Sequence, residues 1–276
     1  MPVLFPLFTS KINYRDHRKI VVIDGEKGFT GGLNLDDRYL NNGKHELFWR
    51  DTHLMIKGDA VKSLQFLFIV NWMFVSKEVF NVTKKYFPKI KFKENKYVQI
   101  NGSGPDWELA SIMDSFFLAI NSAKKNIRIV TPYFIPNESI LNAVLMAARS
   151  GIDVEMMLPM KSDSWIVQSA SMSLLESLLK SNIKVYFYTK GFLHSKVLTV
   201  DNYFSSVGTA NMDMRSFDLN YEVNTYMYNS QLAQELNQQF EEDKKECIQI
   251  VLEDWQKRNL RKKLIESAAR LLAPLL

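Results

Sequence analysis

Two stretches of the chain, HRKIVVIDGEKGFTGGLN at residues 17–34 and HSKVLTVDNYFSSVGTAN at residues 194–211, repeat one pattern. The pattern, H-x-K-x4-D-x6-G-x2-N-x-D-x-R, occurs twice at a constant offset of 177 residues. At roughly one chance in 20 for each specified position, two accidental copies are negligible, so the chain contains an internal duplication. The matched positions are His17/His194, Lys19/Lys196, Asp24/Asp201, Gly31/Gly208, Asn34/Asn211, Asp36/Asp213 and Arg38/Arg215.

Each copy contains a short run of β-branched and apolar residues, KIVVID at 19–24 and KVLTVD at 196–201, which predicts a buried strand. Residues i and i+2 of a strand share a face, so His17 and Lys19 should point the same way, as should His194 and Lys196. A nucleophile or acid beside a cation is what a phosphate site requires.

The other repeated residues have separate expected tasks. Asp24 and Asp201 each open a turn, and we expect their carboxylates to be mainly structural. The small residues at 31–32 and 208–209 should let backbone approach a ligand, and the side-chain amides of Asn34 and Asn211 can donate to phosphate oxygen.

The doubled H-x-K-x4-D motif with its trailing G-[GT]-x-N resembles the phospholipase D superfamily. Segments in and beyond the motifs, TPYFIPNESIL, KGFLHSKVLTVD, SSVGTANMDMRSFDLNYEVN and RLLAPLL, are similar to those of bacterial cardiolipin synthases, so that the resemblance covers essentially the whole chain. It implies two similar lobes that meet at one catalytic site, and phosphatidyl transfer between two phosphatidylglycerol molecules with release of glycerol.

The resemblance also implies roles for single residues. His17 would be the nucleophile that forms a phosphohistidine, and His194 the general acid and base. The lysines and aspartates of the motifs complete the catalytic set, namely Lys19, Asp24, Lys196 and Asp201. Family members often place a carboxylate about 30 residues after each histidine to orient it, and Asp51 and Glu222 stand at that distance.

Composition agrees with metal-free phosphate chemistry. The single cysteine, Cys247, excludes an intramolecular disulfide, and no Cys/His cluster has zinc spacing, so we expect neither metal nor cofactor. A net charge of +5 is compatible with nucleic acid or an anionic lipid surface. The longest apolar stretch, residues 64–75, is too short for the about 20 residues that a bilayer span needs, and is expected to be a buried helix. The resemblance implies a bacterial membrane location, where this chain would be peripheral or soluble.

From residue 97 onward, strand and helix patterns alternate, which predicts an α/β fold in which each lobe is a mixed β-sheet flanked by helices. We expect a first lobe with linker at 1–96 and a second lobe with a C-terminal helix at 97–276. Only sixteen residues precede the first motif, so the first lobe should be incomplete, as in an N-terminally truncated chain, with an uncovered strand edge. The basic amphipathic helix near the C-terminus either binds a membrane surface or packs against the first lobe.

Two other functions remain open from the sequence. The same histidine and lysine pairs serve any phosphodiester, so a nuclease or nucleic-acid phosphodiesterase is one alternative, although the doubled motif makes nucleic acid a less favoured partner. A truncated remnant that binds phosphate without turnover is another. The acceptor alcohol and the oligomeric state are not determined.

Overall fold

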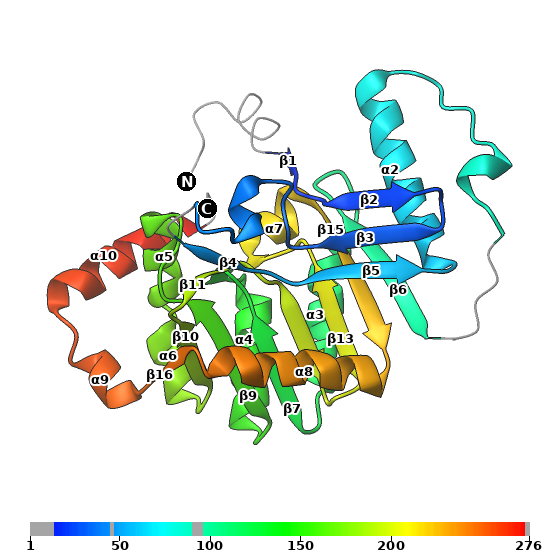
Figure 1. The fold of residues 1–276 in the computed structure, drawn as a ribbon. Coiled ribbons are helices and arrows are strands. Elements are labelled where there is room, and N and C mark those ends of the chain that lie inside the picture. The colour runs from blue at the N-terminus through cyan, green and yellow to red at the C-terminus, as the bar shows by residue number, and fades with distance from the viewer. Residues whose placement is uncertain (1–13, 45–46, 90–95, 274–276) are drawn as a thin grey trace.

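The computed structural model describes residues 14–44, 47–89 and 96–273 and shows a mixed α/β fold (Figure 1). The α/β class expected from the sequence is confirmed. Residues 97 onward form most of the large sheet, and residues before 90 form a smaller layer that lies against it. We use the names first lobe for residues 14–89 and second lobe for residues 96–273.

In the described ranges the large sheet has nine strands, in the order β1-β15-β13-β12-β7-β9-β10-β16, and β6 pairs with the same edge of β15 as β1. Its central strands β7, β9 and β10 are parallel, as βαβ units require. The bounds are β1 Arg15–Asp16, β6 Tyr97–Ser103, β7 Asn126–Val130, β9 Asp153–Pro159, β10 Lys184–Tyr188, β12 Val197–Val200, β13 Phe204–Gly208, β15 Asn220–Tyr228 and β16 Cys247–Ile250.

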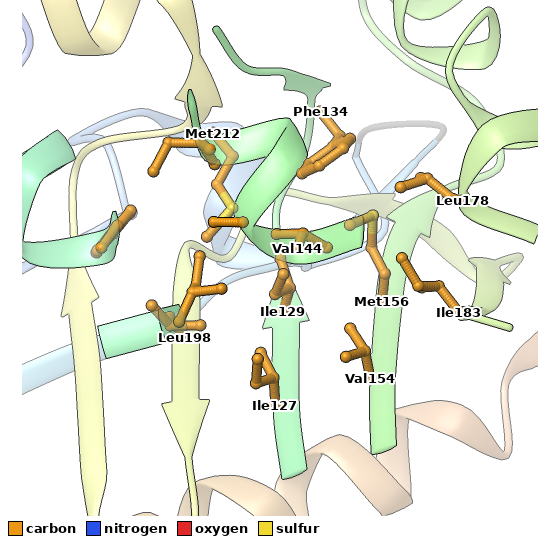
Figure 2. Close-up of a cluster of buried hydrophobic side chains, with 14 of the residues drawn as sticks. Ile127, Ile129, Phe134, Val144, Val154, Met156, Leu178, Ile183, Leu198 and Met212 are labelled. Atoms are coloured by element: carbon orange, nitrogen blue, oxygen red, sulfur yellow. The ribbon is translucent and has the colours of Figure 1, made fainter. Parts of the chain in front are cut away.

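Helices cover both faces of this sheet because its central strands are apolar on both sides. Ile127 and Ile129 of β7 face the cluster formed with α3, α4 and α6 (Figure 2), whereas Val130 packs with Phe240 of α8 on the opposite face. The helices are α3 Ser111–Ser122, α4 Glu138–Arg149, α5 Trp165–Met172, α6 Leu175–Lys180, α7 Met214–Asp218, α8 Ser230–Lys244, α9 Leu252–Gln256 and α10 Leu260–Leu271.

Among the described residues, the first lobe contains a three-stranded antiparallel sheet in the order β2-β3-β5, with α2 packed on one face. Within the described residues, β2 pairs only with β3, so its outer edge is uncovered there. The bounds are β2 Ile20–Ile23, β3 Lys27–Gly31, β5 His53–Lys57 and α2 Ala60–Ser76, with the short helices η2 Asp37–Leu40 and η3 Lys84–Tyr86.

Helix α2 contains the apolar stretch that was expected to lie buried, and that expectation is wrong. Val61, Leu64 and Ile69 are buried against the small sheet, but Phe66 is 60% and Phe74 is 77% exposed. The sheet offers the helix only one narrow face, so the outer side of α2 has nothing to pack against among the described residues. No helix in the described ranges is long and apolar enough to cross a bilayer.

Two short parallel strand pairs join the lobes. In one, β1 of the first lobe adds to β15 of the second. In the other, β4 (Phe48–Arg50) of the first lobe pairs with β11 (Gly191–Leu193) of the second. Gly191 is needed there, because a Cβ at this position would collide with the backbone carbonyl of Phe48. A last pair, β8 (Phe134–Ile135) with β14 (Met212–Asp213), lies within the second lobe.

Candidate active site

The two repeated histidines follow directly from the strands that join the lobes. His17 comes after β1, and its backbone N–H donates to the carbonyl of Tyr221 at 2.9 Å. His194 comes after β11, and its backbone N–H donates to the carbonyl of Arg50 at 2.7 Å. Each histidine is thus fixed by the main chain of the other lobe.

The residues of the motif do not lie in strands as expected. The strands begin one residue after each lysine, at Ile20 and Val197, and the segments that hold His17, Lys19, His194 and Lys196 are irregular. The reason is that the histidine N–H groups bond across the lobe junction rather than along the ladder of their own sheet.

Each imidazole binds a carboxylate of the other lobe. Nδ1 of His17 lies 2.9 and 3.0 Å from the two carboxylate oxygens of Glu222, and Nδ1 of His194 lies 2.7 Å from Oδ2 of Asp51. The spacing in the sequence suggested that each histidine would bind the carboxylate of its own lobe. In the structure, each histidine binds the carboxylate of the other lobe instead. Tyr221 and Arg50 immediately precede Glu222 and Asp51, so the main-chain bonds that hold each histidine also place the opposite carboxylate beside it.

Both carboxylates are shielded from water. The side chain of Glu222 is fully buried and that of Asp51 is 3% exposed, so neither is a surface charge. Burial would raise the pKa of the Glu222 carboxyl, but His17, together with the hydroxyl of Thr209 and the charge of Lys19, holds that pKa below its usual value. An ionised Glu222 accepts the Nδ1–H of His17 and leaves Nε2 of the same ring facing away from it.

The two lysines occupy matching positions. Nζ of Lys19 donates to the backbone carbonyl of His17 at 2.6 Å, and Nζ of Lys196 donates to the carbonyl of His194. Burial lowers the pKa of Lys19 to about 8 and that of Lys196 to about 7, against the opposing attraction of Glu222 and Asp51. The charges of both lobes therefore act on one shared site, and an anion there would restore the charge of both ammonium groups.

His194 is the more enclosed of the two imidazoles, with 9% of its side chain exposed against 27% for His17. Burial, followed by repulsion from Lys196, lowers the pKa of His194 to about 4 in spite of Asp51. His194 is therefore neutral near pH 7 in the unliganded chain.

The motif aspartates lie in left-handed turns at the far ends of their strands, Asp24 at φ 55° and Asp201 at φ 54°. The carboxylate of Asp201 accepts three backbone N–H groups, from Lys124, Lys125 and Asn126, and so fixes the start of β7. Asp24 is exposed.

The repeated asparagines and glycines serve the protein itself. Asn34 donates to the hydroxyl of Tyr39 at 2.9 Å, and Asn211 donates to Asp213 at 3.0 Å. The carbonyl oxygen of the Asn211 side chain is buried without a partner in the structure. A Cβ at Gly32 would meet the carboxylate of Asp51, so this glycine makes room for a protein side chain and not, as expected, for a ligand.

Three aromatic residues that the repeat did not indicate enclose His194. The hydroxyl of Tyr39 lies 3.0 Å from Nδ1 of His194, and the rings of Trp49 and Phe192 lie 5.7 Å from its ring. Tyr39 stands one residue after the last repeated position, where the second copy has Ser216. A comparison of the two copies therefore does not indicate Tyr39. Trp49 and Phe192 are paired across β4 and β11, a pairing that no local pattern shows.

No group of three or more metal-ligating side chains occurs in the part of the chain that the structure describes. The site instead combines two imidazoles, two lysines and two buried carboxylates. This set can supply a nucleophile, a proton donor and positive charge for a phosphoryl group.

Comparison with known proteins points to one family. Residues 117–244 match the family model described as "Cardiolipin synthase, PLD-like domain". The whole chain is 47% identical over 278 aligned residues to cardiolipin synthase 2 of Bacillus anthracis, and 45% identical over 276 to cardiolipin synthase of Geobacillus kaustophilus.

The chain spans 54% and 55% of the length of these two relatives, and thus about half of each. Among solved structures, phosphatidylserine synthase of Haemophilus influenzae aligns with 96% of this chain and 72% of its own, with a TM-score of 0.69. At 17% identity, this similarity establishes the fold alone.

Proposed function

The chain belongs to the phospholipase D-like family, and from this premise we propose that it holds the catalytic centre of a cardiolipin synthase. The reaction would transfer a phosphatidyl group from one phosphatidylglycerol to a hydroxyl of another, giving cardiolipin and glycerol. The names of the relatives support this choice of substrate. The observation that supports a catalytic centre is the pairing of each histidine with a carboxylate of the other lobe. Glu222 binds His17, and Asp51 binds His194.

In the first half of the reaction, Nε2 of His17 attacks phosphorus and forms an N–P bond. The P–O bond to the glycerol headgroup breaks, and His194 gives its proton to the leaving oxygen. Glu222 keeps the proton of His17 on Nδ1, so that the lone pair of Nε2 is free to attack. Lys19 and Lys196 stabilise the charge on the phosphoryl oxygens.

In the second half, a hydroxyl of another phosphatidylglycerol gives its proton to the neutral His194 and attacks phosphorus. The N–P bond breaks, cardiolipin leaves, and His17 is restored. Because water competes with this alcohol, the aromatic wall of Tyr39, Trp49 and Phe192 around His194 would favour transfer over hydrolysis.

The protonation state of His194 sets a condition on this scheme. With a pKa of about 4 it is neutral in the empty site, yet the first half needs its proton. A bound phosphodiester carries a negative charge, which raises the pKa of a nearby imidazole. Substrate binding would therefore convert His194 into the acid.

The test follows phosphatidylglycerol in mixed micelles with the chain and with its His17→Ala and His194→Ala variants, measuring cardiolipin and glycerol. Cardiolipin formed by the unmutated chain and abolished in both variants supports the proposal. Phosphatidic acid in place of cardiolipin would make the chain a hydrolase, and cleavage of a nucleic-acid diester alone would make it a nuclease. No turnover of any diester would leave a phosphate-binding remnant.

The roles of the two histidines need a separate experiment. The chain is incubated with phosphatidylglycerol labelled in the phosphatidyl group and quenched at high pH, where phosphohistidine is stable. A label retained by the His194→Ala variant and absent from the His17→Ala variant supports His17 as the nucleophile, and the reverse pattern exchanges the roles.

A further inference from the structure

Helix α10 is attached to the second lobe by its small residues. Ala269 and Ala273 lie in a buried cluster with Ala170 of α5 and Ile135 of β8. One of the two expectations for this helix was packing against the first lobe, but its main contact is with α5 of the second lobe. This contact uses the alanine side, and the described residues leave the opposite side of the helix uncovered.

The opposite side of α10 carries a stripe of exposed leucines. Leu260, Leu264 and Leu271 are 74%, 69% and 82% exposed, and their spacing of four and seven residues puts them on one side of the helix. Three aligned leucines in water are unfavourable, because each leaves most of an apolar side chain hydrated.

Cations border this stripe. Arg261 and Arg270 are exposed on α10, one on each flank of the leucines, whereas the exposed Lys262 lies seven residues before Ala269 and so on the alanine side. The acid of the same helix, Glu266, is bound to Arg258 at 2.5 Å. A stripe of leucine bordered by arginine on both flanks is complementary to a surface that is apolar within and anionic at its rim, which is the interface of an anionic bilayer.

The end of α10 lies beside α5, and a series of contacts leads from α5 toward the candidate active site (Figure 1). Helix α5 begins at Trp165, which is 69% exposed. Just before α5, Asp163 accepts a hydrogen bond from Tyr133, whose ring lies 6.5 Å from that of Phe192, beside His194. A bilayer that met α10 would therefore be near the site.

We propose that the leucine stripe of α10 is a docking surface for an anionic phospholipid bilayer, with its leucines below the headgroups and its cations among them. This inference rests on the proposed function, in which the substrate is a membrane phospholipid. It adds the element by which the chain meets that membrane, and α5, Tyr133 and Phe192 connect this element to His194.

The test measures co-sedimentation of the whole chain with vesicles of phosphatidylglycerol and phosphatidylcholine, and with vesicles of phosphatidylcholine alone. The Leu260→Gln/Leu264→Gln/Leu271→Gln variant should bind anionic vesicles at least about tenfold more weakly. The Arg261→Gln/Arg270→Gln variant should lose about 30-fold at low salt on anionic vesicles, and little on neutral ones.

A matched control is the Leu109→Gln/Leu118→Gln variant. Leu109, just before α3, is 69% exposed, and Leu118, within α3, is 68% exposed. This variant should bind vesicles like the unmutated chain. His17→Ala should also keep vesicle binding, so a failure of catalysis is distinguished from a failure of docking. Circular dichroism confirms that each variant is folded.

Three results would overturn the proposal. These are no binding of the unmutated chain to anionic vesicles, equal binding by the α10 leucine variant, or an equal loss in the Leu109/Leu118 control. If sedimentation shows that the unmutated chain dimerises and the leucine variant does not, with vesicle binding unchanged, the stripe is a contact between copies and the membrane assignment is wrong.

Discussion

Glu222 of the second lobe binds Nδ1 of His17 in the first lobe at 2.9 Å, although 205 residues separate them. The reciprocal pair, Asp51 and His194, spans the junction in the opposite direction. Both pairs depend on the short parallel strands that join the lobes. The proposed catalytic centre is therefore a property of the junction, and neither lobe contains a complete histidine and carboxylate unit of its own.

The exchange of carboxylates predicts how the site variants should couple. Glu222→Gln and Asp51→Asn should each lower transfer by about two to four orders of magnitude, because the amide no longer fixes the tautomer of its imidazole. In a double-mutant cycle of unfolding free energies, Glu222→Gln should be strongly non-additive with His17→Ala. Single-turnover rates of cardiolipin formation measure the loss of transfer, and urea unfolding of the four chains measures the coupling. Stronger coupling of Glu222 with His194 would contradict the crossed assignment.

The lysine pKa values predict the pH dependence of anion binding. Lys19 and Lys196, with pKa values of about 8 and about 7, are charged at pH 6 and lose their protons as the pH rises. The affinity for sulfate, whose charge is constant in this range, should fall between pH 6 and pH 10. Titration calorimetry measures it, and the midpoint should lie above the pKa values of the empty site because the bound anion favours charged lysine.

The Lys19→Gln/Lys196→Gln variant is the control for that titration. Its sulfate affinity should be weak and nearly independent of pH. An unchanged pH profile in this variant would mean that other groups bind the anion.

His194 should make the protein less stable in acid. Its pKa is about 4 in the folded chain against about 6.5 when unfolded, so the unfolded state binds more protons between these values. Stability is complete above pH 6.5 and falls as the pH drops toward 4, by up to about 3 kcal/mol. Urea unfolding at pH 7 and pH 4.5 should show a smaller loss for His194→Asn than for the unmutated chain. Equal losses would show that other groups cause the acid sensitivity.

The two motif aspartates should differ in their effect on stability. Asp201→Ala removes the acceptor for three backbone N–H groups at the start of β7 and should lower the free energy of unfolding by about 2 kcal/mol more than Asp24→Ala does. The control is matched because both residues have nearly the same positive φ, so the strain on alanine cancels. Thermal or urea unfolding measures the difference. Equal losses would argue against the capping role.

Much of the fold follows from local sequence patterns. The alternation of strand and helix after residue 97 predicted the layered α/β order that the structure shows. These patterns succeed because the period of apolar residues reflects which faces are buried. The apolar run in α2 gave a wrong prediction of burial. An apolar run can indicate a helix, but it does not show which other elements will cover that helix.

The sequence by itself determined the duplication, the family resemblance and the chemical set of two histidines, two lysines and two carboxylates. Identical spacing in two copies is information that the chain carries locally. Which carboxylate serves which histidine, the aromatic wall around His194, and the low pKa values of the lysines were decided by the tertiary structure. They arise where β1 meets β15 and β4 meets β11, because hydrogen bonds and burial depend on distances in space that no spacing along the chain specifies.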